Sequence, residues 1–232
     1  MRYIKKSGTE PEDLQKYKRD CRRASPPLKI TYKDMPKDGS RKQLAVDQGY
    51  ICAYCMRRVC LDSENKEQYI NIEHIVPQNQ LTDEEATNFS NFIGVCSGGR
   101  DKKDNARKTC DAYRGALSEE QQIMQLNPLN EAQMETIRYR PTGEIYSTDK
   151  VLSHQLSEKL NLNGESTYLK ENRATAYQNL LKVLKREKVQ GKWSKTLLKN
   201  MWDVFCKPNE TGAYREYVGV YEYWLKHWMH KR

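Results

Sequence analysis

The spacing of apolar residues changes along this chain and is most regular towards its end. From Ser166 onward, apolar residues recur at steps of three and four, as on the buried face of an amphipathic helix. The residues that set this spacing are Leu180, Leu181, Leu184, Leu197, Leu198, Met201, Trp202 and Phe205. The pattern predicts a C-terminal helical region, which we place at residues 146–232.

The middle of the chain has patterns typical of short strands. Residues 69–76 (YINIEHIV) are rich in β-branched and aromatic side chains and precede Pro77, which predicts a strand that stops there. Residues 97–109 carry glycines and alternating charges, and their one apolar residue is Ala106, which predicts a surface insertion. Further on, two short strand-like runs flank residues 141–143 (PTG), so we expect a hairpin there.

The first fifty residues alternate between helix-like and extended patterns. Residues 11–21 predict a helix, whereas residues 25–40 contain three prolines and a glycine, which favour an extended arm. Residues 41–48 predict a short helix that Gly49 ends. Short strands among helices indicate an α+β fold. The chain divides into a basic N-terminal arm (1–40), a central core (41–145) and the C-terminal helical region (146–232).

The distribution of charge along the chain indicates a polyanion as a possible class of partner. The 232 residues include 40 Lys and Arg against 31 Asp and Glu, a formal net charge of +9. Residues 1–50 have 13 basic and 7 acidic side chains, residues 51–150 have 12 and 16, and residues 151–232 have 15 and 8. Basic flanks around an acidic centre suit a protein that binds a polyanion at its flanks and a cation at its centre. A solvated lysine surface is the alternative.

The distribution of apolar residues also indicates where in the cell the protein is located. No run reaches the roughly 18 apolar residues that a membrane span needs, and residues 1–20 lack the apolar centre of a signal peptide. We therefore expect a cytoplasmic protein without a membrane partner.

Seven cysteines, an odd number, favour thiols or metal ligands over a disulfide framework in such a chain. Cys52 and Cys55 form a CxxC pair, which can present two thiolates to one tetrahedral cation. Cys96 and Cys110 can complete the set, although 13 residues separate them. We predict a structural Zn²⁺ held by these four cysteines. Cys60 is the competing ligand, and a redox-active CxxC pair is the alternative reading.

The order of motifs around these cysteines resembles that of the HNH endonucleases. The CxxC pair is followed by Glu73-His74-Ile75-Val76-Pro77, then by Asn91-Phe92-Ile93-Gly94-Val95-Cys96, and then by Cys110 with a polar and a basic residue after it. Members of that family carry a ββα-metal finger. The resemblance implies an α+β chain in which a small ββα-metal (HNH) finger with a zinc knuckle is embedded among helices, so that residues 41–145 are the nuclease core.

The resemblance implies a role for individual residues. His74 would be the general base, while Glu73 and Asp111 would hold a catalytic Mg²⁺ or Mn²⁺. Asn91 would fix the loop that carries His74, with Asn88 as its rival. Arg114 would contact a phosphate. Asp111 stands where the family usually has Asn or His, and Asn105 could serve instead if the insertion shifts the register.

Across the whole chain the similarity is greatest to the HNH subunit of Septu-type anti-phage systems, including those carried with retrons. It rests on MRYIKK at the start, on NPLNEAQMETIRYRPTGEI and on LNLNGESTYLKENRATAYQNL. It implies an antiviral defence role beside an SMC-like or ABC-type ATPase and, in retron systems, a reverse transcriptase with its msDNA. The nucleic acid that is cut would be DNA or tRNA.

Two further interpretations stay open from the residues alone. A zinc-finger binding module without catalysis would retain nucleic acid or a protein and leave it intact. The late aromatic residues, from Tyr214 to Trp228, have near-helical spacing and serve either as core or as a partner surface.

Overall fold

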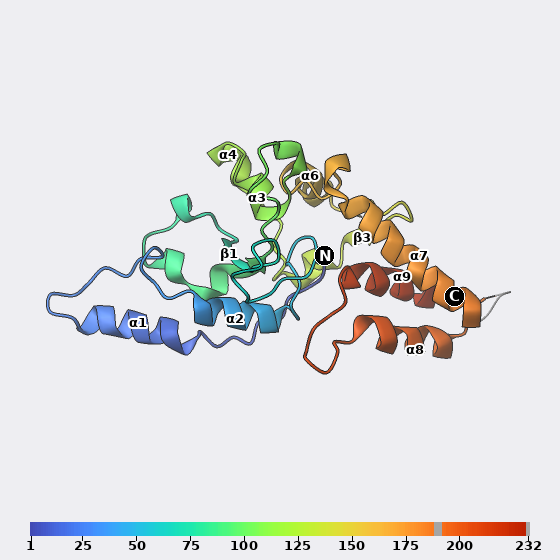
Figure 1. Cartoon of the computed structure of the whole chain (residues 1–232), viewed down its shortest axis with the longest axis horizontal. Helices are drawn as coiled ribbons and strands as arrows, with labels where there is room; N and C mark the ends of the chain where they lie inside the picture. Colours follow the sequence, from blue (N-terminus) through green and yellow to red (C-terminus); the bar gives the residue numbers. More distant parts are fainter. Residues whose placement is uncertain (188–191, 231–232) are drawn as a thin grey trace.

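The computed structural model describes residues 1–187 and 192–230 and has a mostly helical α+β fold. Figure 1 shows helices α1 and α2 at one end and helices α7, α8 and α9 at the other. The N-terminus lies in the middle of the molecule. Within the described residues the strands form two antiparallel pairs. The α+β class predicted from the sequence is confirmed.

Two helices shape the N-terminal region. Helix α1 spans Glu12–Arg23, as predicted, and helix α2 spans Asp38–Asp47, three residues earlier at its start than its spacing indicated. The segment between them has no strand and no helix. Gly49 follows α2 with φ +61°, and a Cβ there would stand 2.2 Å from the Tyr214 ring, so this turn requires glycine.

The first strand pair is short and regular. Strand β1 (Asn71–His74) pairs antiparallel with β2 (Phe92–Val95), with Glu73 opposite Ile93 and His74 opposite Phe92. The predicted strand at 69–76 is therefore confirmed in its centre and is shorter at both ends. The connection between the strands contains three short 3₁₀ helices, η1 (Gln78–Gln80), η2 (Glu85–Thr87) and η3 (Phe89–Asn91).

After β2 the chain enters the predicted insertion, which is largely exposed. It contains η4 (Asn105–Arg107) and ends where helix α3 (Cys110–Arg114) begins. Helices α4 (Glu119–Gln122) and α5 (Glu131–Met134) follow. The predicted hairpin is confirmed as β3 (Ile137–Tyr139) and β4 (Ile145–Ser147).

The C-terminal region is helical over its described residues, as predicted. Its elements are α6 (Lys150–Glu158), η5 (Glu165–Thr167), α7 (Leu169–Glu187), α8 (Lys195–Cys206) and α9 (Val218–His230). Helices α8 and α9 pack on each other and α7 packs on α9. Residues 188–191 and 231–232 of the predicted region lie outside the described residues.

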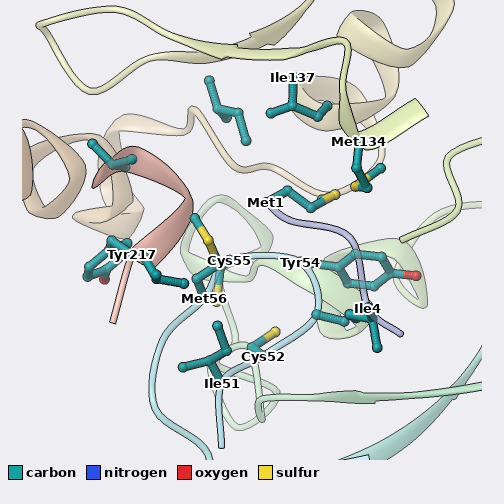
Figure 2. Close-up of a cluster of buried hydrophobic side chains, with 14 of the residues drawn as sticks. Met1, Ile4, Ile51, Cys52, Tyr54, Cys55, Met56, Met134, Ile137 and Tyr217 are labelled. Atoms are coloured by element: carbon teal, nitrogen blue, oxygen red, sulfur yellow. The ribbon is translucent and has the colours of Figure 1, made fainter. Parts of the chain in front are cut away.

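One hydrophobic cluster joins all three segments of the chain. Figure 2 shows Met1 and Ile4 beside Tyr54. Side chains of the CxxC turn, of β3 and of the segment that leads into α9 lie nearby. The CxxC pair thus lies in the core, where a cation bound to it would be shielded from water. No described helix has the length and apolar content that crossing a membrane requires.

Candidate metal centre and the adjoining acidic site

Four cysteines from three separate parts of the chain meet in the core. The ligand atoms of Cys52, Cys55, Cys96 and Cys110 all lie within 4.8 Å of one another, and all four residues are buried. The Sγ atoms of Cys55 and Cys96 are 3.6 Å apart, and those of Cys52 and Cys110 are 3.9 Å apart. A tetrahedral Zn²⁺ with bonds of about 2.3 Å separates its sulfur ligands by about 3.8 Å. The spacing and the soft donors therefore fit zinc.

The backbone explains why these four residues converge. Cys52 and Cys55 lie on either side of a tight turn, closed by a hydrogen bond from the Met56 N–H to the Cys52 carbonyl (3.0 Å). Cys96 follows directly after β2, and Cys110 begins α3. The 13-residue insertion therefore separates Cys96 and Cys110 in sequence but returns to the same place in the fold.

The four thiols share a polar neighbour that sequence reasoning missed. The Arg57 guanidinium donates to Cys96 Sγ (3.6 Å) and to Thr109 Oγ1 (3.0 Å). Burial raises the pKa of Cys52 and of Cys110 well above the usual thiol value. Burial also opposes ionisation of Cys55, but hydrogen bonds from the other three thiols and the nearby Arg57 charge outweigh it and lower its pKa. Arg57 would offset part of the negative charge of four zinc-bound thiolates.

The other cysteines lie apart from this cluster. Cys60, the competing ligand, directs its Sγ at the Asp62 carbonyl (3.7 Å) and is absent from the group of four. Cys21 and Cys206 are buried thiols of the N-terminal and C-terminal helices.

A second cluster, which we call the acidic site, adjoins the cysteines through α3. It consists of Glu73, His74, Asp111 and Arg114. Glu73 is 8% exposed, and its Oε1 accepts a hydrogen bond of 2.6 Å from the Arg114 guanidinium. Arg114 is 3% exposed and also donates to the carbonyls of His74 (3.1 Å) and Gln122 (2.7 Å). This arginine thus ties β1 to α3 and to the end of α4.

Two carboxylates are close together at the acidic site. Burial raises the pKa of Glu73 well above its ordinary value, and the nearby charge of Asp111, with a hydrogen bond between the two side chains, raises it further. Asp111 itself forms an ion pair with Arg100 of the insertion. Two neighbouring carboxylates of this kind form a pair of hard oxygen donors.

His74 is enclosed rather than open. It is 4% exposed, and its ring lies edge-on against Tyr32 (4.6 Å between centroids) and Phe92 (4.9 Å). Its Nε2 contacts the Ala86 carbonyl at 2.8 Å, which requires a proton on Nε2. Nδ1 is then the basic nitrogen, and the Gln78 amide approaches it at 3.3 Å. Burial lowers the pKa of His74, which favours the neutral ring.

The strand pairing decides how Glu73 and His74 are arranged. Because regular pairing continues through His74, neighbouring side chains leave β1 on opposite faces. Asp111 acts on both, since its charge raises the pKa of Glu73 and opposes the fall in that of His74. The structure therefore brings the two carboxylates together and places the imidazole within electrostatic reach of Asp111.

The two asparagines of the predicted motif have different contacts. Asn91 receives a hydrogen bond from the Val76 N–H (2.9 Å) and donates to the Val76 carbonyl (3.1 Å), which closes the loop after His74. Asn88 instead accepts from the Ser90 N–H (3.0 Å) at the start of η3. The hydrogen bonds expected of Asn91 are present, and its part in catalysis stays a prediction.

The structure also shows the contacts of the other residues predicted for the site, and of two residues that were not predicted. Asn105 begins η4 in the exposed insertion, whereas Asp111 lies near enough to Glu73 to raise its pKa. The hydrogen bonds of Arg114 to Glu73 and to carbonyl oxygens mean that its predicted phosphate contact would require them to be exchanged. Arg100 and Gln78, which sequence reasoning did not single out, contact Asp111 and His74, and the position of Gln78 four residues after His74 was the available signal.

No protein-family model matches this chain, and no curated protein is significantly similar to it. The residues and their geometry therefore carry the functional argument.

Proposed function

We propose that the protein is a metal-dependent HNH-type endonuclease that hydrolyses phosphodiester bonds of DNA or RNA. The observation that supports this most is that β1 and α3 bring two carboxylates together, with a histidine whose basic Nδ1 lies in a ring within electrostatic reach of Asp111, beside a four-cysteine cluster. Strand β1, strand β2 and helix α3 would then be the ββα finger. Neutral imidazole can take a proton from water at physiological pH.

In this proposal His74 supplies the base. The Ala86 carbonyl holds the proton on Nε2 and so leaves the Nδ1 lone pair available. Gln78 donates to that nitrogen, so a water would replace the Gln78 amide before its proton is taken. Asn91 keeps the loop beyond His74 closed by its two hydrogen bonds to Val76.

The carboxylates would hold the divalent cation. Glu73 and Asp111 provide the hard oxygen donors that Mg²⁺ or Mn²⁺ takes in proteins, and their mutual repulsion is what a cation would relieve. When bound, such a cation stabilises the negative charge that develops on phosphorus and on the leaving oxygen. The four cysteines would hold Zn²⁺ as a structural ion.

The proposed setting is an anti-phage complex. An SMC-like or ABC-type ATPase would recognise the invader and gate the nuclease, and a retron reverse transcriptase with its msDNA would accompany it in retron systems. The enclosed His74 is consistent with a nuclease that needs a partner for full activity, since only 4% of this residue is exposed. Co-purification of the full-length chain with the ATPase tests this part.

A nuclease assay with matched histidine variants tests the activity. The wild type, His74→Ala and His154→Ala are incubated with plasmid DNA and with total tRNA, with Mg²⁺ or Mn²⁺, in the presence and absence of the ATPase. We expect His74→Ala to lower cleavage by about 10²- to 10⁴-fold, the usual contribution of a general base. His154 is exposed on α6 and serves as the control, which should cut as the wild type does. Zinc content, measured on the same samples, should be equal in all three.

Substantial cleavage by His74→Ala would overturn this assignment. A nucleic-acid-binding zinc module without catalysis is the second candidate, favoured by the pairing of both carboxylates with arginines. It predicts retention of nucleic acid and about one zinc per chain, without any cleavage even when the ATPase is present.

A further inference from the structure

A wide hollow lies between the insertion and the segment before α7. Its volume is about 1000 Å³, and it adjoins a second hollow of about 730 Å³. The two hollows share four lining residues, Arg57, Glu67, Thr167 and Tyr168, and we describe them together as one groove. We call it the Tyr168 groove.

The insertion wall of the groove is held in place by the rest of the fold. The Asn161 amide donates to the carbonyls of Ala106 (3.1 Å) and Lys108 (2.8 Å). The Thr109 N–H donates to the Gly98 carbonyl (2.8 Å), which closes the base of the insertion. Because its ends are pinned, the insertion presents its basic residues at defined positions.

Basic side chains predominate along the larger hollow. Lys66, Arg100, Lys102 and Arg107 line it together with Arg57, against three acidic residues, Glu67, Asp101 and Glu165. Lys102 pairs with Asp101 at 3.4 Å and Arg107 with Asp104 at 3.9 Å, and all four of these side chains are more than half exposed. Such pairs contribute little in water, so an incoming phosphate can replace their carboxylates.

Tyr168 has the features of a platform for a planar ligand. It is 71% exposed, more than any other large hydrophobic residue in the described part of the chain. Its φ is +57°, in the left-handed region that side chains rarely adopt, and it lines both hollows. Strained positions of this kind cluster at ligand sites, and an exposed aromatic ring can stack on a nucleic-acid base.

The groove leads to the acidic site. Asn71 lines the larger hollow, and Glu73, two residues further along β1, lies on the same face of the strand. Arg100 lines the same hollow and forms the ion pair with Asp111. A chain lying in the groove would therefore run towards the two carboxylates.

We propose that the Tyr168 groove binds a single-stranded stretch of nucleic acid. An unpaired base stacks on Tyr168, and backbone phosphates contact Lys66 and Lys102. Bases of a duplex are covered by their neighbours and cannot reach such a platform. That the bound strand is the substrate rests on the proposed nuclease function, whereas binding itself does not.

Fluorescence anisotropy with labelled 15-residue oligonucleotides tests the groove. The full-length protein, with its zinc retained and without added Mg²⁺ or Mn²⁺, is titrated against single-stranded RNA, single-stranded DNA of the same sequence, and the DNA duplex. We expect tighter binding to a single strand than to the duplex, and the two single-stranded arms identify the preferred sugar.

Substitution of Tyr168 separates stacking from folding. Tyr168→Gly removes the ring and suits φ +57°, so the melting temperature should not fall. We expect its affinity for the single strand to drop about 5- to 100-fold, the usual effect of losing one stacked base. Tyr168→Phe keeps the stacking surface and should bind as the wild type does. Equal affinity of the wild type and Tyr168→Gly, or tighter binding of the duplex, would overturn the proposal.

The lysines are tested by the salt dependence of binding. Lys66→Gln and Lys102→Gln should each lower the slope of log affinity against log salt by about 0.7, as expected for one phosphate contact on a single strand. Lys182→Gln, on the exposed side of α7, is the matched control and should leave the slope unchanged. Equal slopes for all three variants would contradict the proposed phosphate contacts.

The cleavage assay and the binding assay together allow the groove proposal and the nuclease proposal to fail independently. Weakened binding by Tyr168→Gly without any cleavage dependent on His74 supports the groove and counts against the nuclease. Cleavage dependent on His74 with unchanged binding by Tyr168→Gly supports the nuclease and overturns the groove.

Discussion

The cysteine cluster and the acidic site begin at adjacent residues of α3, yet they are stabilised in opposite ways. Cys110 joins three other buried thiols that share a single nearby positive charge, Arg57, whereas Asp111 joins a set in which each carboxylate has its own arginine. The thiols therefore need an external cation to be stable as thiolates, whereas the acidic site is already balanced by the protein. We therefore expect that zinc at the first cluster contributes to folding, whereas a cation at the second cluster would act without holding the fold together.

The largest expected effect follows from breaking the cysteine cluster. Cys55→Ser should abolish zinc binding and leave the chain largely unfolded, because structural zinc contributes about 10–16 kcal/mol at neutral pH. That is comparable to the whole net stability of about 5–15 kcal/mol typical of a protein. Zinc content and far-ultraviolet circular dichroism measure the effect.

Cys60→Ser is the matched control for the zinc prediction. Its sulfur contacts the Asp62 carbonyl, and Cys60 is not part of the group of four cysteines. It should retain about one zinc per chain and a native spectrum. Full folding of Cys55→Ser without metal would remove the contrast between the two sites.

A smaller effect is expected from the buried ion pair of the acidic site. Arg114→Met should lower the free energy of unfolding by about 3–5 kcal/mol, because it leaves the buried Glu73 carboxylate unpaired. The double variant with Glu73→Gln should recover part of this loss, since the uncompensated charge is then gone. Urea denaturation, read as the shift of the midpoint, gives both values.

Lys207→Met provides the comparison for that loss. Lys207 pairs with Asp203 at 2.7 Å, and both side chains are more than half exposed. A surface pair of this kind contributes about 0–1 kcal/mol, so the midpoint should barely move. Equal losses for Arg114→Met and Lys207→Met would show that Arg114 does not hold β1 to α3.

The smallest effect on stability is expected at the other carboxylate. Asp111→Asn removes a charge whose partner, Arg100, is 58% exposed, and it also relieves the repulsion of Glu73. The free energy of unfolding should change by less than about 1 kcal/mol. Under the proposed function, the affinity for Mg²⁺ should nevertheless fall, because Asn keeps an oxygen donor but lacks the negative charge that attracts the cation, and cleavage at limiting Mg²⁺ should fall with it. A stability loss of several kcal/mol would mean that Asp111 is structural, like Arg114.

Local patterns predicted much of the secondary structure. The helical spacing of Leu180, Leu184 and Leu198 corresponds to buried positions of α7 and α8. The PTG turn corresponds to the β3–β4 connection, where Gly143 has φ +83°. The start of α2 was misplaced by three residues, because the spacing of apolar residues does not mark the first turn of a helix. These features depend on a few neighbouring residues, and for that reason they can be read along the chain.

The residue types that form the two sites can be read from the sequence: a CxxC pair with two later cysteines, an acidic residue before a histidine, and an asparagine before the second strand. The fold, by contrast, fixes the partners of these residues. It excluded Cys60 from the thiol cluster, paired Glu73 with Arg114, enclosed His74 beneath Tyr32 and connected Arg100 to Asp111. The physical reason is that burial and charge pairing depend on residues distant in sequence. The free energy of each buried charge is set by whichever of those residues the fold brings next to it.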